Sequence, residues 1–528
     1  MNKKLQVWVP LLFSVALIIG MLLGYRMRDA MPGKNFFSLD KAHPLQEVMD
    51  LIKNKYVDDV KLAEISDTAI KAMLNKLDPH SVFITAREVD AVNEDIAGSF
   101  FGIGVQFDIL DDTINVLSVV PDGPSFKAGI ITGDKFIKVN DSMVAGKKIS
   151  VERVRKLLRG DIDTKVNITV LRDGLQKIVS FPRGMIPVSS VDASYLMGNG
   201  IGYIRLNKFT QVAYREFMKA LEGLQKQGMK KLLLDLRGNG GGVLDEATAI
   251  ADEFLDGDKL ITYTEGIHFP KKEYRCKREG LFEKGELVVL ADEGTASASE
   301  VLLGALQDWD RATIIGRRSF GKGLVQEQYD LSDGSALRLT IARYYTPIGR
   351  SIQRPYSKGE KAYYNEISNR FHDGEVSNAD SVKNDTSKVY KTKNGKTVYG
   401  GGGITPDIFV PLDTSGYGLA SAKLYSKGIM SGFAYRYQLQ NKILLTGFKT
   451  PADFISRFSF SDENWKQFSD FAAKDSVGLD KISLKEKENF IQQIKSAVAR
   501  QLWHNEGFYE MMNSYDNAVK KAVGLLSK

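Results

Sequence analysis

The stretch Asp292-Glu-Gly-Thr-Ala-Ser-Ala-Ser-Glu300 joins an apolar run, Leu287 to Ala291, to a segment with helical spacing, Val301 to Leu306. The apolar run has the length and composition of a buried strand. A loop of small residues between a strand and a helix can carry a hydroxyl to the helix N-terminus, where unpaired backbone N–H groups point outward. The stretch therefore predicts a reactive hydroxyl in a strand-to-helix turn, and we take Ser297 as its candidate.

A second loop of small residues, Ser319-Phe-Gly-Lys-Gly323, carries a lysine that can serve as the base that a serine nucleophile needs. Lysine is a base only when it is neutral, so its pKa of about 10.4 would have to fall by roughly 3 units through desolvation. The uncharged neighbours of Lys322 favour such a fall, and Arg317 and Arg318 would add to it if they face inward. An ordinary exposed loop lysine is the alternative.

Histidine is the alternative base. The chain has five histidines, and none lies in a glycine-rich loop beside a predicted strand end. The partners of a Ser-His-Asp triad need only meet in space, so the sequence leaves this arrangement open, with His268 as its candidate base.

The length, charge and cysteine content limit the class of protein. The chain has 528 residues, enough for several domains of ~100–200 residues each. Its net charge of +7 is spread out, and no basic stretch is interleaved with aromatic residues, so we expect no nucleic-acid partner. A single cysteine, Cys276, excludes an internal disulfide and thiol-rich metal sites. We find no metal-ligand spacing and expect neither a metal nor another cofactor.

An uncharged stretch near the N-terminus, Val7 to Gly24, follows Lys3 and Lys4 and precedes Arg26 and Arg28. It is long for the core of a signal peptide and just long enough to span a bilayer, and no small-residue cleavage site is evident. We predict an uncleaved membrane anchor, with a cleaved signal as the alternative. Positive charge on both sides leaves the orientation open, and export of the bulk of the chain is the simplest arrangement.

Short strands fill the segment from 99 to 183, with a helix over Val151 to Leu158 and a hairpin around Arg172-Asp-Gly174. This pattern resembles a PDZ domain. The resemblance implies a carboxylate-binding loop, whose consecutive N–H groups would cradle the C-terminus of a polypeptide. The residues of this loop are Phe101, Gly102, Ile103 and Gly104. The adjoining run Val105 to Ile109 offers an edge for strand addition, and a plain turn at the two glycines is the alternative.

Strands and helices alternate from about residue 202 to 345, which indicates an α/β layer with a mainly parallel sheet. One strand, Lys230 to Leu236, runs into a glycine-rich loop, Arg237-Gly-Asn-Gly-Gly-Gly242. Residues 356–397 are polar and aperiodic, which is typical of a long surface insertion. Helical spacing dominates the tail of the chain, where the residues indicate packing and no chemistry.

Four motifs, in a fixed order behind the PDZ module, make the chain similar to the C-terminal processing (tail-specific) peptidases over residues 45–412. The motifs are Asp235-Leu-Arg-Gly-Asn-Gly-Gly-Gly242, Thr295-Ala-Ser-Ala-Ser-Glu300, Ser319-Phe-Gly-Lys-Gly323 with Gln326, and Gly402-Gly-Ile-Thr-Pro-Asp407. The resemblance implies a multidomain α/β and α architecture with a ClpP/crotonase-like α/β protease core. It also implies substrates that end in apolar or small residues, and a PDZ module that gates activity by repositioning when it is occupied.

The same resemblance assigns roles to individual residues. It makes Ser297 the nucleophile, Lys322 the general base, and Gln326 the residue that orients the lysine. Ser299, two residues along the same turn, would face another direction. Glu300 is either an acid of the site or a first-turn acid of the helix.

Acyl transfer also needs N–H donors for an oxyanion. The N–H of Ala298 is one candidate, and a glycine N–H from residues 240–242 is the second, of which we take Gly241. Asp308 would lie about 16 Å down the predicted helix from Ser297 at ~1.5 Å per residue, too far for direct contact.

These inferences predict an anchor at 1–30, a helical region at 41–97, a PDZ domain at 98–185, a Ser-Lys peptidase core at 186–412 and a C-terminal helical extension at 413–528. The predicted function is that of an exported serine endopeptidase that captures polypeptide C-termini and cleaves them through an acyl-enzyme. We expect it in the cell envelope, anchored in the inner membrane with its catalytic part in the periplasm. Expected partners are peptides with free C-termini, the membrane, an adaptor protein and further copies of the chain in a homo-oligomer. The rival hypothesis is a PDZ scaffold with an inert core.

Overall fold

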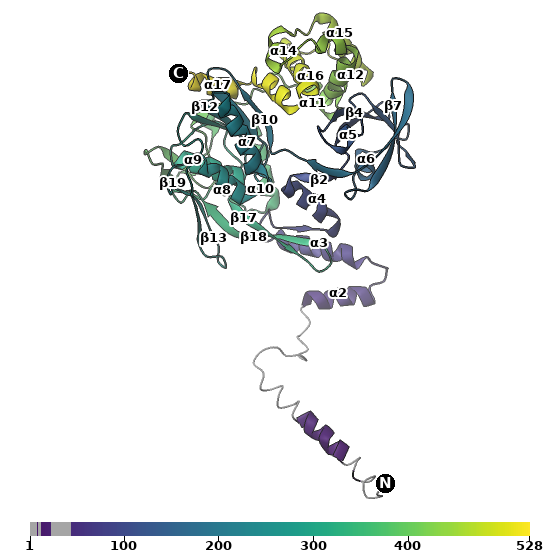
Figure 1. Ribbon diagram of the computed structural model, residues 1–528. Coiled ribbons are helices and arrows are strands. Elements are labelled where there is room, and N and C mark those ends of the chain that lie inside the picture. Colours follow the sequence, from purple (N-terminus) through teal and green to yellow (C-terminus); the bar gives the residue numbers. More distant parts are fainter. Residues whose placement is uncertain (1–7, 9–11, 23–43) are drawn as a thin grey trace. The chain divides into compact units, whose positions relative to one another are not determined.

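The computed structural model describes residues 8, 12–22 and 44–528, and the chain divides into two units, residues 1–70 and 71–528 (Figure 1). Residues 12–22 are helical, α2 spans Pro44–Lys55 and α3 spans Leu62–Leu74. Within the described residues, no helix combines the length and the apolar composition needed to cross a bilayer. The anchor predicted over residues 7–24 falls partly outside the described residues and stays a prediction.

A six-stranded sheet forms the centre of the second unit, in the order β10-β11-β12-β15-β16-β21. All neighbouring strands are parallel except β10 and β11, which are antiparallel. The mainly parallel sheet predicted from the sequence is therefore confirmed. The strands are β10 (Val191–Leu196), β11 (Ile201–Leu206), β12 (Lys231–Asp235), β15 (Leu287–Ala291), β16 (Thr313–Gly316) and β21 (Ile408–Phe409).

Alternate side chains of this sheet enter two different cores, because neighbours along a strand point to opposite faces. On one face Leu232, Leu234 and Val289 pack with helices α7, α8 and α9. On the other face Leu233 and Leu290 pack with helix α17, so the sheet is covered on both faces, as is usual for parallel strands (Figure 1). The helices are α7 (Ala213–Lys226), α8 (Leu244–Asp252), α9 (Ala298–Asp308) and α17 (Asn517–Leu526).

A second sheet is antiparallel and has the order β1-β18-β13-β14, with β17 paired to β18. Strand β18 ends the region over which the sequence predicted alternating strands and helices. Strand β17, which the sequence did not predict, begins directly after the loop that carries Lys322 and so fixes the place of that loop. The strands are β1 (Val82–Ile84), β13 (Leu260–Glu265), β14 (Lys272–Arg275), β17 (Leu324–Asp330) and β18 (Ala336–Tyr345). Helix α4 (Ala86–Ala97) follows β1.

The PDZ-like module has its own core, in which Ile114, Phe136 and Ile168 are fully buried. Strands β2 and β9 pair where the chain enters and leaves the module. The predicted helix over residues 151–158 is confirmed as α6. The elements are β2 (Ser99–Gly102), β3 (Val105–Leu110), β4 (Thr113–Val119), α5 (Pro124–Lys127), β5 (Lys135–Val139), β6 (Ser142–Met143), α6 (Val151–Leu158), β7 (Lys165–Arg172), β8 (Leu175–Pro182) and β9 (Gly184–Pro187).

The polar segment 356–397 is not a surface insertion throughout, and this prediction was wrong in part. It forms α10 (Glu360–His372), a 3-10 turn (Ala379–Ser381), β19 (Val389–Lys391) and β20 (Thr397–Tyr399). Tyr363 and Arg370 of α10 are 2% and 3% exposed, and Arg370 Nη1 donates to the carbonyl of Ser319 at 2.8 Å. Since α10 packs through arginine and tyrosine contacts, the segment lacks the apolar periodicity by which a buried helix is detected.

The tail of the chain forms helices, as its spacing predicted. A separate apolar core joins most of them, and it includes Phe433, Phe454, Phe468 and Phe490. The helices are α11 (Leu419–Ser426), α12 (Ile429–Gln440), α13 (Lys442–Leu445), α14 (Pro451–Arg457), α15 (Asp462–Lys474) and α16 (Leu484–Asn513), followed by α17.

Candidate active site

A cleft of about 660 Å³ lies at the carboxyl edge of the parallel sheet, the edge where ligands bind in open α/β sheets. Three of the predicted site residues, Ser297, Lys322 and Gln326, line this one cleft although they come from two different loops and a strand. The glycine loop also lines it, together with Ala298. The structure therefore brings together the residues that the motifs had grouped.

Ser297 follows strand β15 and is the N-cap of α9, the position that the apolar run and helical spacing had predicted. Its backbone has φ 58° and ψ −118°, a conformation that non-glycine residues rarely adopt. The carbonyl of Ser297 lies 2.9 Å from the hydroxyl of Tyr344, which also contacts the carbonyl of Lys322. Backbone strain of this kind persists only where the surroundings hold it, and it is frequent at functional sites.

Glu300 holds the two loops together. Its side chain is fully buried, and burial raises the pKa of its carboxyl. Oε2 accepts from the N–H groups of Ser297 at 2.9 Å and Lys322 at 2.8 Å. Oε1 accepts from the N–H of Gly321 at 2.7 Å and the hydroxyl of Ser319 at 2.5 Å. Both roles that the sequence left open are present: Glu300 is a first-turn acid of α9, and its carboxylate also fixes the backbones of Ser297 and Lys322 at the site.

The amine of Lys322 is partly buried and donates to Gln326 Oε1 at 2.7 Å. Its pKa is lowered to about 8, first by burial and then by the guanidinium of Arg338, while the carboxylates of Asp78 and Glu300 oppose the shift. The structure records no hydrogen bond between this amine and the Ser297 hydroxyl, both of which are among the described residues. The desolvation expected from the uncharged neighbours of Lys322 is thus present.

Arg317 and Arg318 do not lower the pKa of Lys322, and the positive charge that does so belongs to another arginine. Arg317 pairs with Glu293 at 2.8 Å, and Arg318 pairs with Glu375 at 2.7 Å. Both guanidinium groups are therefore neutralised by acids. The guanidinium of Arg338, on β18, lowers the pKa of Lys322 instead, and this effect could not be predicted from the sequence because it depends on the pairing of β17 with β18.

Gln326 is held from both ends of its amide. Its oxygen accepts from Lys322, and its nitrogen donates to the carbonyl of His80. The His80 ring contacts the Tyr363 hydroxyl at 2.9 Å, and burial and the nearby Lys322 lower its pKa to about 4. The turn around residues 78–81 therefore helps to orient Gln326.

The glycine loop lies against the serine loop, and Asn239 joins them. The carbonyl of Asn239 accepts from the N–H of Ala296 at 2.9 Å and from the hydroxyl of Ser299 at 2.9 Å. Gly241, at φ +96°, comes so close that an added Cβ would lie 2.9 Å from the Cβ of Ser297. Only glycine fits such an approach.

The choice of Gly241 as oxyanion donor needs a correction. The N–H of Gly241 donates to the side-chain oxygen of Asn239 at 2.9 Å and is therefore already paired. Within the described part of the chain, no acceptor is recorded for the N–H groups of Gly240, Gly242 or Ala298. The sequence could not show that Asn239 folds back on its own loop.

The remaining candidates, Ser299, Asp308 and His268, do not line the cleft. Ser299 is fully buried and bonds to Asn239, so it faces away from the cleft as expected. Asp308 is buried and pairs with Arg350 at 2.5 Å, away from the cleft lining. His268, the candidate base of a histidine triad, is exposed in the turn between β13 and β14 and does not line the cleft.

A second groove, of about 290 Å³, runs between β3 and α6 of the PDZ-like module. Gly102, Ile103 and Gly104 of the predicted carboxylate-binding loop line it, but Phe101 does not. Phe101 lies in β2 opposite Met185, and its neighbour Phe100 lines the groove instead, because successive side chains of a strand point to opposite sides.

A serine at a strained helix start and a desolvated lysine thus line one cleft, and the same chain carries a groove in a PDZ-like module. A model of peptidase family S41 matches residues 200–358, and a PDZ-domain model matches residues 102–181. A family model of unknown function matches residues 421–504. The chain belongs to peptidase family S41.

Two sequence relatives extend this assignment to a serine-type C-terminal processing peptidase. The carboxy-terminal-processing protease of Bartonella bacilliformis is 36% identical over 316 residues, which are 58% of this chain and 71% of the relative. The carboxy-terminal processing protease CtpA of Bacillus subtilis is 32% identical over 358 residues, 67% of this chain and 76% of the relative. The solved structure of a photosystem II D1 C-terminal processing protease matches at 28% identity over 70% of this chain and 86% of that chain, with a TM-score of 0.37.

Proposed function

We propose that this C-terminal processing peptidase is exported and membrane-anchored, and that it works through Ser297 as nucleophile and Lys322 as general base. The observation that carries the proposal is the position of Lys322. Its amine lies in the same cleft as Ser297, has a pKa lowered to about 8, and is held by Gln326. A neutral amine can take the proton that a serine hydroxyl must lose before it attacks an amide.

The proposed reaction starts when the C-terminus of a polypeptide binds in the PDZ groove and the segment ahead of it enters the cleft. Ser297 Oγ attacks the amide carbonyl, and its proton passes to Lys322 Nζ. The N–H of Ala298 and a glycine N–H, from Gly240 or Gly242, stabilise the oxyanion. Lys322 then gives the proton to the leaving amine, the C–N bond breaks, and an acyl-enzyme remains. Water then attacks this ester while Lys322 Nζ takes its proton. The bond to Ser297 Oγ breaks, Lys322 returns the proton to Oγ, and the product leaves as its carboxylate.

The PDZ groove supports apolar C-termini as the substrate class. Its walls carry Ile103, Val105, Phe107, Val151 and Leu158, which offer burial to an apolar terminal side chain. The peptide would add as a strand along β3, so its backbone would bind whatever its sequence.

Incubation of a peptide that has a free apolar C-terminus with the wild type, Ser297→Ala and Lys322→Ala tests the mechanism. We expect cleavage by the wild type only, and no cleavage of the same peptide when its C-terminus is amidated. Equal turnover by wild type and Ser297→Ala would exclude Ser297 as nucleophile, and a cleaved amidated peptide would exclude capture of the carboxylate.

The proposal also includes the anchor, the division into regions at 1–30, 41–97, 98–185, 186–412 and 413–528, a homo-oligomer and an adaptor protein.

Export is tested by the digestion of the catalytic part with added protease in spheroplasts. The anchor is tested by extraction of the protein from membranes, which should need detergent and not occur with salt. An N-terminal sequence of the mature protein that begins after Gly24 would replace the anchor by a cleaved signal. Light scattering of the purified protein measures the oligomeric state.

A further inference from the structure

The C-terminal extension is joined to the glycine loop through one ion pair. Arg237, the residue that begins this loop, donates from its Nη1 to Asp516 Oδ2 at 2.7 Å. Its other nitrogens donate to Asp235 at the end of β12, at 2.9 and 2.7 Å. The guanidinium is thus held between the sheet and the start of α17.

The two carboxylate oxygens of Asp516 accept hydrogen bonds from different partners. Oδ1 accepts from the N–H of Val519 at 2.9 Å and so caps helix α17, while Oδ2 accepts from Arg237. A cap of this kind satisfies a helix N–H that has no partner within the helix. The same carboxylate therefore fixes the helix start and the loop start.

A second contact supports the same loop from α16. Arg205 Nη2 donates to the carbonyl of Arg237 at 2.8 Å, and its guanidinium stacks on the ring of Tyr509 at 4.6 Å. The residue after Arg237 links the glycine loop to the serine loop, since the N–H of Gly238 donates to Asp292 Oδ1 at 2.8 Å. Asp292 opens the loop that ends at Ser297, so the contacts run from the C-terminal helices to both loops of the cleft.

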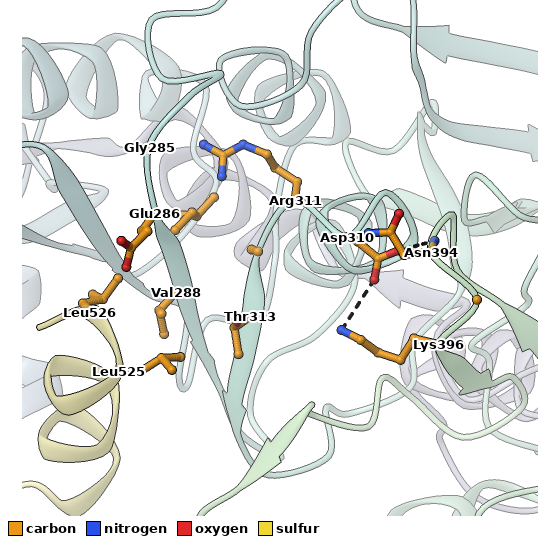
Figure 2. Close-up of a pocket in the computed structure, with 13 residues that line it drawn as sticks. Gly285, Glu286, Val288, Asp310, Arg311, Thr313, Asn394, Lys396, Leu525 and Leu526 are labelled. Carbon is orange, nitrogen blue, oxygen red and sulfur yellow. Dashed lines mark hydrogen bonds and ion pairs between the residues drawn. The ribbon is translucent and has the colours of Figure 1, made fainter. Parts of the chain in front are cut away.

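The far end of α17 is fixed as well. The helix crosses the sheet in the direction opposite to β12, since Lys231, the first residue of β12, donates to the carbonyl of Leu526 at 2.5 Å. Figure 2 shows Leu525 and Leu526 beside Glu286 and Val288, around a cavity of about 720 Å³. This cavity lies at the strand starts, and none of the predicted site residues is among those that line it.

We propose that Asp516 is a positioning residue for the peptidase reaction, which makes α17 of the C-terminal extension part of the catalytic unit. It acts through Arg237 on the glycine loop, which carries an oxyanion donor in the proposed function, and the inference rests on that function. A misplacement of ~1 Å in such a donor is enough to cost on the order of a hundredfold in rate. Asp516 lines neither the cleft nor the PDZ groove, so its removal should affect the rate and not the binding of the peptide.

Two substitutions separate this role from the helix cap. Asparagine and serine are both good N-caps, but neither carries charge, and the single side-chain oxygen of each cannot cap α17 and bind Arg237 together. Asp453→Asn is the matched control, because it removes an exposed aspartate–arginine pair, with Arg457, elsewhere in the extension. Ser297→Ala is measured in the same assay.

We expect Asp516→Asn and Asp516→Ser to lower kcat about tenfold, while KM, the affinity of the PDZ groove for a labelled peptide and the thermal midpoint stay as in the wild type. Asp453→Asn should keep the wild-type kcat. Wild-type kcat in both Asp516 variants, with Ser297→Ala inactive, would overturn this inference alone. A loss of kcat that is matched by a lower thermal midpoint would also overturn it, in favour of a purely structural role. An active Ser297→Ala would overturn the proposed function together with the inference.

Discussion

The amine of Lys322 donates a hydrogen bond of 2.7 Å to the amide oxygen of Gln326, and the amide nitrogen donates in turn to the carbonyl of His80. The amide cannot turn over without losing both bonds, because its oxygen only accepts and its nitrogen only donates. A neutral amine that donates to Gln326 keeps its lone pair for another proton. This arrangement is suited to a lysine that acts as a base.

The first prediction concerns pH. Because the pKa of Lys322 is lowered to about 8, its amine is protonated below that pH and neutral above it. We expect kcat/KM to rise about tenfold per pH unit up to about pH 8 and then to level off. Hydrolysis of one peptide, measured from pH 6 to 10, checks this. A midpoint near 6.5 would point to a histidine base instead.

The second prediction concerns the identity of the base. A guanidinium stays protonated at any pH that the fold tolerates, so Lys322→Arg should be as inactive as Lys322→Ala, both at least about a thousandfold below the wild type. Initial rates with the two variants decide this. Activity in the arginine variant above that of the alanine variant would contradict the role of Lys322 as base.

The third prediction tests the charge beside the lysine. Since the guanidinium of Arg338 lowers the pKa of Lys322, Arg338→Gln should raise that pKa and move the rise of kcat/KM to higher pH. Activity at pH 7 should fall several-fold and match the wild type at pH 10. Arg343→Gln is the control, because Arg343 lies on the same strand, is exposed and donates to the Tyr356 hydroxyl. An unchanged profile in Arg338→Gln would exclude this electrostatic effect.

The fourth prediction concerns stability. Glutamine in place of Glu300 keeps the size of the side chain but turns an amide N–H₂ toward two of its donors. We expect the free energy of unfolding to fall by about 2–4 kcal/mol, since a buried charged acceptor of several hydrogen bonds is lost. Urea unfolding measures the change. Glu293→Gln, which breaks the pair with Arg317 nearer the surface, should cost about 1 kcal/mol or less.

The fifth prediction separates binding from chemistry. Val151 lines the PDZ groove and is 45% exposed, so Val151→Asp should weaken the binding of apolar C-termini without unfolding the module. We expect KM to rise about tenfold and kcat to stay unchanged. Ile178→Asp is the control, since Ile178 is 72% exposed in the same module and lies outside the groove. A fall in kcat with unchanged KM would show that Val151 acts on the reaction itself.

The sequence by itself determined the parallel sheet, the PDZ-like module and the placing of Ser297 at a strand-to-helix turn. These features follow from local patterns: a buried strand reads as an apolar run, and a helix start reads as small residues ahead of a 3.6-residue period. The motifs around Ser297 and Lys322 also sufficed to indicate the family. The sequence motifs also placed the glycine loop beside Ser297. The structure agrees, because only glycine permits the close approach that Gly241 makes to Ser297.

Only the tertiary structure decided which groups surround these residues. Arg338 and His80 reach the lysine site from β18 and from the turn ahead of β1, and Asp516 reaches the glycine loop from the start of α17. The pairing of the Gly241 N–H with Asn239 and the packing of α10 through arginine and tyrosine were equally hidden. Such contacts are made by single polar side chains between segments far apart in the chain, and they leave no periodic pattern in the sequence because their partners are set by the fold.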